Sequence, residues 1–63
     1  MTPTQWLLLN NLTTGQHWSS GMHVQEASEA LAWAERCGYL REWELTDAGI
    51  DFWRRNQHDK PKE

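Results

Sequence analysis

The chain has 63 residues and carries 6 Lys and Arg residues against 9 Asp and Glu residues, a formal net charge of −3 at pH 7. This length allows a single small domain, expected over residues 1–55, and the one cysteine excludes an internal disulfide. Five tryptophans are many for such a chain, and each can bury on the order of 150 to 250 Å². We therefore expect a core rich in aromatic side chains.

Targeting and membrane signals are not apparent in the sequence. Residues 1–5 show neither the positively charged region nor the small-residue cleavage site of a signal peptide. The leucine run at residues 7–9 stops at Asn10, far short of the roughly 20 apolar residues that cross a bilayer. A lone thiol suits a reducing compartment, so we expect a cytoplasmic protein with no membrane partner.

A first helix is predicted over residues 3–13. Thr2 and Gln5 have the spacing of a capping box, Pro3 suits the first helical position, and Gly15 supplies a left-handed stop. The apolar side chains of one face are Trp6, Leu8, Leu9 and Leu12. The polar side chains expected to face water are Asn10 and Asn11. Residues 15–23 then lose the helical period, and their two glycines and two serines predict a loop or a single irregular turn.

A second helix is predicted over residues 24–37 from apolar residues spaced three or four apart. The expected packed face is Val24, Ala27, Leu31, Ala34 and Cys37. The expected polar positions are Gln25, Glu26, Ser28, Glu29, Glu35 and Arg36. Gly38 fits the position after the helix, where Tyr39 can pack back on the last turn in a Schellman motif.

A very short hairpin and a third helix are predicted next. Alternation along residues 39–45 predicts one side made of Tyr39, Arg41, Trp43 and Leu45, opposite Leu40, Glu42 and Glu44. Thr46 is a good N-cap, and Asp47 suits the positive end of the helix dipole. Arg54 and Arg55 suit its negative end. Residues 56–63 are polar, contain a proline and predict a disordered tail.

Residues 27–53 carry the order of a helix closed by Gly38-Tyr39-Leu40, a short hairpin and a helix opened by Leu45-Thr46-Asp47-Ala48-Gly49. This order resembles the back half of winged-helix domains of the MarR and PadR regulator families. Those families have a complete second helix where residues 15–23 stand, and this segment is too short and glycine-rich to form one. The resemblance implies a reduced winged-helix-like domain, mainly α with a short β-hairpin, and a regulator from a prokaryote or phage.

Catalysis, metal binding and cofactors are not expected. The potential metal ligands are scattered without a short spacing: His17, His23, Cys37 and His58. Cys37 lies on the expected packed face at a helix C-terminus, which suits a core residue better than a nucleophile. A domain of this size rarely encloses a pocket that excludes water, so the sequence predicts no enzyme and no small-molecule substrate.

Two binding functions stay open. The first is protein–protein interaction or self-association, with expected contact residues Trp18, Met22, Glu26, Glu29, Arg41 and Trp43. The second is DNA binding, which the resemblance implies through the helix of residues 24–37. Its expected contact residues are Gln25, Ser28, Arg36, Arg41, Arg54 and Arg55. On that helix three glutamates outnumber one arginine, and acidic residues flank Trp43. The carboxylates would repel phosphates, so the sequence favours a protein partner.

Overall fold

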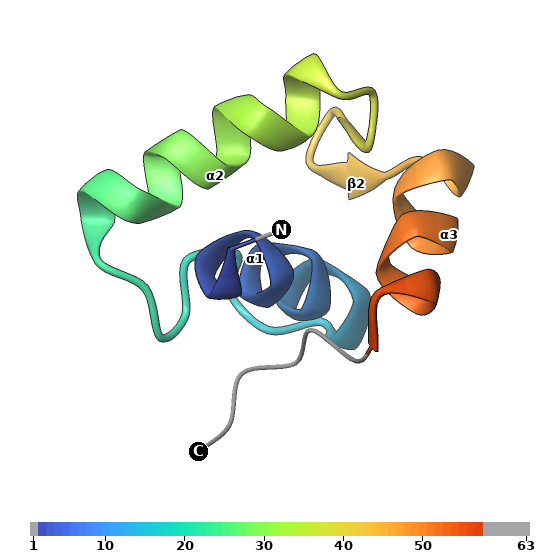
Figure 1. Ribbon diagram of the computed structural model, residues 1–63. Helices are drawn as coiled ribbons and strands as arrows, with labels where there is room; N and C mark the ends of the chain where they lie inside the picture. Colours follow the sequence, from blue (N-terminus) through green and yellow to red (C-terminus); the bar gives the residue numbers. More distant parts are fainter. Residues whose placement is uncertain (1, 58–63) are drawn as a thin grey trace.

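The structure, a computed structural model, describes residues 2–57, and this part of the chain forms three helices and one hairpin (Figure 1). The elements in chain order are α1 (Pro3–Thr14), α2 (Val24–Arg36), β1 (Leu40–Arg41), β2 (Glu44–Leu45) and α3 (Asp47–Arg55). The predicted mainly helical fold with a short β-hairpin is confirmed, in a small winged-helix-like arrangement. No helix within residues 2–57 has the length and apolarity needed to span a membrane.

Helix α1 lies at the centre, where α2, the hairpin and α3 all contact it (Figure 1). Its predicted capping box is present: the Gln5 amide donates to Thr2 Oγ1 over 3.1 Å, and the Thr2 amide donates to Gln5 Oε1 over 3.0 Å. Gly15, with a φ of 81°, ends the helix one residue later than predicted. Leu8 and Leu9 are fully buried, so the predicted apolar face is the packed face.

The prediction that Asn11 faces water is wrong, because its side chain is only 1% exposed. Its Nδ2 donates to the carbonyl oxygens of Trp18 and Ser20 over 3.1 and 2.9 Å. Residues 15–23 form the predicted irregular turn, and an irregular backbone next to a core needs side-chain donors for its carbonyls. Asn11 therefore holds this irregular segment in place against α1.

Helix α2 packs through small side chains, with Ala27, Ala30 and Ala34 buried. Two predicted members of this face are wrong: Val24 is 79% exposed, and Cys37 is exposed. Val24 opens the helix, one turn before the first buried alanine, and Cys37 is already the C-cap because the helix ends at Arg36. Both positions fall beyond the stretch of α2 that is buried.

The end of α2 has the predicted Schellman motif. The Tyr39 amide donates to the Ala34 carbonyl over 2.9 Å, the Gly38 amide donates to the Glu35 carbonyl over 3.1 Å, and Gly38 has a φ of 78°. The short hairpin that follows pairs Leu40 with Leu45. The predicted alternation through residues 39–45 is wrong here, because the chain reverses within it and the two leucines become directly opposed neighbours.

The hairpin base, which we define as Gly38, Tyr39, Thr46 and Gly49, joins α2 to α3. The predicted N-cap is confirmed: Thr46 Oγ1 accepts from the Gly49 amide over 3.1 Å and also donates to the Gly38 carbonyl over 2.7 Å. A methyl group at Gly49 would lie 2.2 Å from the Tyr39 carbonyl oxygen, so only glycine allows α3 to approach this closely. The Tyr39 ring stacks on Phe52 with centroids 4.5 Å apart, which adds aromatic packing to the joint.

Helix α3 ends at the start of the predicted tail. Asn56 is its C-cap, and Asn56 Nδ2 donates to the Phe52 carbonyl over 2.8 Å. Gln57 Nε2 donates to the Trp53 carbonyl over 3.0 Å. The rest of the predicted tail, residues 58–63, lies outside the described residues.

Candidate functional site

The tip of the hairpin presents a tryptophan in an unusual backbone conformation. The two residues that connect β1 to β2, Glu42 and Trp43, have φ values of 52° and 67°. Type I′ turns require positive φ at both central positions, and for that reason they favour Asn and Gly there. In larger residues this conformation costs on the order of 1 kcal/mol each, and such strain concentrates at functional sites. The Trp43 side chain is nevertheless 59% exposed.

Trp18 supports this exposed ring from the irregular turn. The Trp18 and Trp43 rings are 5.5 Å apart between centroids and tilted by 53°, although 24 residues separate them in the sequence. Trp18 is half-buried, and both it and Met22 pack against the core cluster. The structure therefore brings together two of the six residues predicted for partner binding, Trp18 and Trp43, and it gives Trp18 and Met22 a packing role.

Trp43 lines two hollows. The smaller, of about 120 Å³, is lined by Leu31, Glu35, Leu40, Glu42 and Trp43. The larger, of about 310 Å³, is lined by Leu12, Thr13, Trp43, Glu44, Leu45 and Ile50. We call Trp18, Trp43 and these lining residues the Trp43 surface. The Trp43 ring lines both hollows, and each hollow is also lined by leucine side chains and at least one carboxylate.

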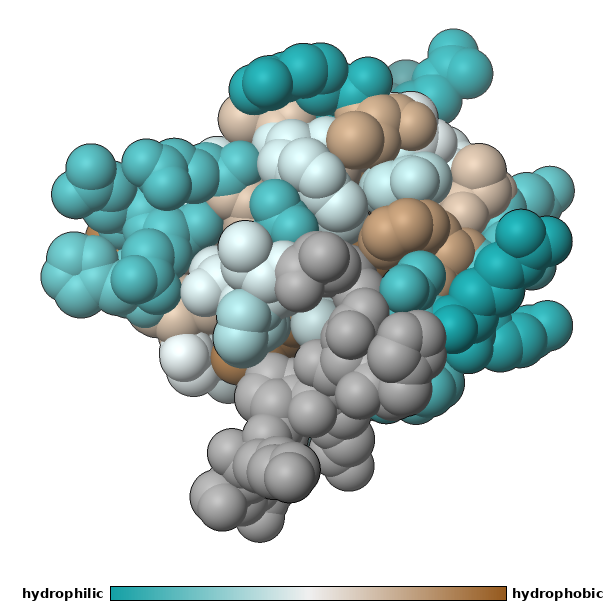
Figure 2. Space-filling model, in the orientation of Figure 1, coloured by the Kyte–Doolittle hydropathy of each residue, from teal (hydrophilic) through white to brown (hydrophobic). Residues whose placement is uncertain are grey.

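Apolar side chains reach the molecular surface in this region. Figure 2 shows hydrophobic side chains at the surface between the C-terminal end of α2, the hairpin and α3, with hydrophilic side chains around them. Leu45 and Ile50 are half-buried, which leaves part of each side chain accessible. An apolar centre with a polar rim is the usual anatomy of a protein interface.

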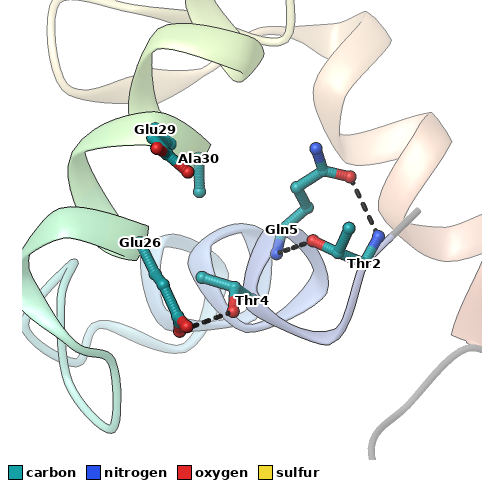
Figure 3. A pocket seen from close by; sticks show the side chains of 6 residues that line it. All are labelled: Thr2, Thr4, Gln5, Glu26, Glu29 and Ala30. Carbon is teal, nitrogen blue, oxygen red and sulfur yellow. Dashed lines mark hydrogen bonds between the residues drawn. The ribbon is translucent and has the colours of Figure 1, made fainter.

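Glu26 and Glu29, also predicted for partner binding, lie elsewhere. They line a hollow of about 280 Å³ between α2 and the start of α1, together with Thr4 and Ala30 (Figure 3). Thr4 Oγ1 donates to Glu26 Oε2 over 3.4 Å. This hollow shares no lining residue with the two beside Trp43, so Glu26 and Glu29 lie apart from Trp43.

Arg41 and the residues predicted for DNA binding are exposed but spread over three elements. Arg41 lies opposite Glu44 on the hairpin and lines neither hollow beside Trp43. Arg55 donates from Nε to Asp51 Oδ2 over 3.0 Å, the only ion pair within residues 2–57. The other positions predicted for DNA contact are exposed: Gln25, Ser28, Arg36 and Arg54. The exposed surface of α2 also carries its three glutamates, beside which a phosphate backbone would be repelled.

The potential metal ligands do not gather in the described part of the chain. No group of three or more His, Cys, Asp or Glu side chains in residues 2–57 is arranged to hold a metal ion. His17 instead stacks near Trp18, with ring centroids 6.0 Å apart, and His17 Nδ1 lies 2.9 Å from Ser19 Oγ. His58, the fourth potential ligand, is outside the described residues.

Sequence reasoning missed the residues that shape the hollows beside Trp43. Leu31 and Glu35 are one helical turn apart on α2, and they meet Glu42 only because the hairpin folds back over that helix. The consecutive acidic and aromatic residues at 42–43 were the one local signal, because neither residue suits a tight turn. No protein-family model matches the chain, and no curated protein or solved structure shows significant similarity to it.

Proposed function

We propose that this protein is a non-catalytic interaction module that binds a protein partner or a second copy of itself through the Trp43 surface. The observation that carries the proposal is the conformation of Trp43, which is 59% exposed on a turn with positive φ at both central residues. A sequence chosen for folding alone would place Asn and Gly at residues 42 and 43. In the cell such a module would act as an accessory regulator, as the winged-helix resemblance implies for a prokaryote or phage.

The energy available from covering Trp43 is large enough to matter for binding. A tryptophan buries on the order of 150 to 250 Å² when fully enclosed, and apolar burial contributes roughly 25 cal/mol per Å². Enclosing the exposed 59% of the ring would then contribute about 2–4 kcal/mol. This is the range of an interface hot spot, where a single aromatic side chain dominates the affinity.

Trp43→Gly tests the proposal without endangering the fold. Glycine adopts positive φ at no steric cost, so relief of turn strain offsets the lost stacking on Trp18, and we expect the free energy of unfolding to change by less than about 1 kcal/mol. Wild-type and variant proteins are immobilised and exposed to a lysate of the native host, and bound proteins are identified by mass spectrometry. We expect a specific partner on the wild type that is absent from Trp43→Gly.

Val24→Ala is the matched control, because Val24 is the other large hydrophobic residue exposed within residues 2–57 and lies at the opposite end of α2. It removes exposed apolar surface away from the hairpin, so partner capture should persist. Sedimentation of the purified proteins covers self-association, which Trp43→Gly should abolish and Val24→Ala should leave intact. Equal capture and equal sedimentation of all three proteins would rule out the Trp43 surface as the binding site.

DNA binding is the competing function implied by the resemblance, and it predicts a different response to salt. Affinity for duplex DNA would fall steeply as salt increases, because the contacts would be with phosphates. A mobility shift at low salt that disappears in a protein with Arg36, Arg54 and Arg55 replaced by glutamine would favour this function. If Trp43→Gly left that mobility shift unchanged, DNA binding would be independent of the Trp43 surface.

A further inference from the structure

We infer that the smaller hollow beside Trp43 accepts an arginine side chain of the partner protein. The inference rests on the proposed function and specifies the chemistry of the partner at one position. Its basis is the combination of an indole, two leucines and two carboxylates that line a recess of about 120 Å³. Each component suits a different part of an arginine side chain.

The size of the hollow selects a single side chain. Pockets for small molecules typically enclose about 300 to 1,000 Å³, and a water molecule occupies about 30 Å³ in the liquid. A recess of about 120 Å³ therefore has room for a few waters or one side-chain head group. A metabolite or nucleotide cofactor would extend well beyond it.

The walls determine which head group is favoured. Leu31 is half-buried and Leu40 is buried, and both line the hollow, so they offer apolar surface to the methylene groups of a long side chain. Trp43 is accessible, and the face of an indole is the aromatic surface that attracts cations best. A planar guanidinium stacks on such a face and sheds its water more readily than an ammonium, which favours arginine over lysine.

The charge at the rim complements that cation. Glu35 and Glu42 are exposed at the hollow, and within residues 2–57 neither forms an ion pair with a cation of this chain. Arg36 and Arg41, the cations nearest to them in the sequence, do not line the recess. An incoming guanidinium can therefore stack on Trp43 while it donates hydrogen bonds to a carboxylate, which gives direction to the contact.

The test uses the full-length protein and the pentapeptide Gly-Gly-Arg-Gly-Gly, blocked at both ends, as the probe. Binding is followed by NMR through the indole N–H signal of Trp43, which is assigned by its loss in Trp43→Gly. The matched probe replaces arginine with citrulline, which has nearly the same shape and no charge. We expect saturable millimolar binding of the arginine peptide and about tenfold weaker binding of the citrulline peptide.

Glutamine variants test which carboxylates are involved. Glu35→Gln and Glu42→Gln should each lower the affinity for the arginine peptide about threefold, because each removes one charge from a partly exposed contact. Asp47→Asn is the matched control, because it also removes one exposed carboxylate charge, from a residue of α3 that lines neither hollow beside Trp43. Its affinity for the peptide should equal that of the wild type.

Three outcomes would overturn the inference: no saturable shift of the Trp43 signal, equal affinity for both peptides, or an equal loss of affinity in Asp47→Asn. A dimer in buffer alone that Glu42→Gln dissociates would make a second copy the occupant and would exclude a foreign partner. If partner capture still depends on Trp43 while the arginine peptide does not bind, the proposed function stands and only the inference of an arginine contact is wrong. If neither is seen, both proposals fail.

Discussion

The base and the tip of the short hairpin differ in how well their residues suit the backbone conformations that they adopt. At the base, the residue types suit the conformations and the space available: Gly38 has positive φ, Thr46 caps a helix, and Gly49 lies where no side chain fits. At the tip, Glu42 and Trp43 occupy positive-φ positions that other residues would fill with less strain. The base is therefore built for stability, whereas the tip gives up stability to expose a large aromatic ring.

Gly49→Ala at the base is expected to have the largest effect. The added methyl group would lie 2.2 Å from the Tyr39 carbonyl oxygen, and a backbone atom cannot move aside as a flexible side chain can. We expect a loss of about 3 kcal/mol or more in the free energy of unfolding, measured by urea denaturation.

Gly38→Ala is the control for that variant, because a methyl group there meets no atom within 4 Å. It carries only the cost of positive φ, about 1 kcal/mol. If the two variants lost the same stability, the close approach of α3 to Tyr39 would not be what holds the base together.

Thr46→Ala should have the next largest effect. The change removes the hydrogen bond from the Gly49 amide and the one to the Gly38 carbonyl, so α3 loses its cap and its tie to the end of α2. We expect a loss of about 1–2 kcal/mol in thermal or urea denaturation. Thr46→Ser keeps both hydrogen bonds and should lose much less. If Thr46→Ala left the free energy of unfolding unchanged, aromatic packing alone would hold the hairpin base together.

Glu42→Asn at the tip should have the smallest effect and the opposite sign. Asparagine adopts positive φ more readily than glutamate, so we expect a gain of about 0.5 kcal/mol and a rise of a few degrees in melting temperature. Glu44→Asn is the matched control, because it removes the same charge from the same hairpin at a residue without positive φ. If both variants gained the same stability, the gain would come from the lost charge, and it would not show backbone strain at residue 42.

Features held by local interactions could be predicted from the sequence. The capping box of Thr2 and Gln5, the Schellman motif after α2 and the Thr46 cap all depend on residues within a few positions of one another. Helix bounds were predicted within one residue for the same reason, since caps and stops act locally. The exposure of Trp43 was also within reach, because a tryptophan next to a turn is a candidate for exposure.

The errors concern which side chains are buried. Asn11 is polar, and sequence patterning places polar residues in water, yet the carbonyls of Trp18 and Ser20 supply the partners that make its burial favourable. Val24 and Cys37 continue the apolar spacing of α2, but the buried stretch of the helix stops short of both. Helical periodicity describes a face of a helix and cannot tell how much of its length is covered.

The sequence by itself determined the three helices, their caps and stops, and the presence of a short hairpin, because backbone hydrogen bonds at helix ends are satisfied by near neighbours. Only the tertiary structure decided that Trp18 meets Trp43 and that Glu35 meets Glu42 across a hollow. Those meetings depend on how the hairpin packs against α1 and α2. This packing joins side chains of different elements, which no local pattern encodes.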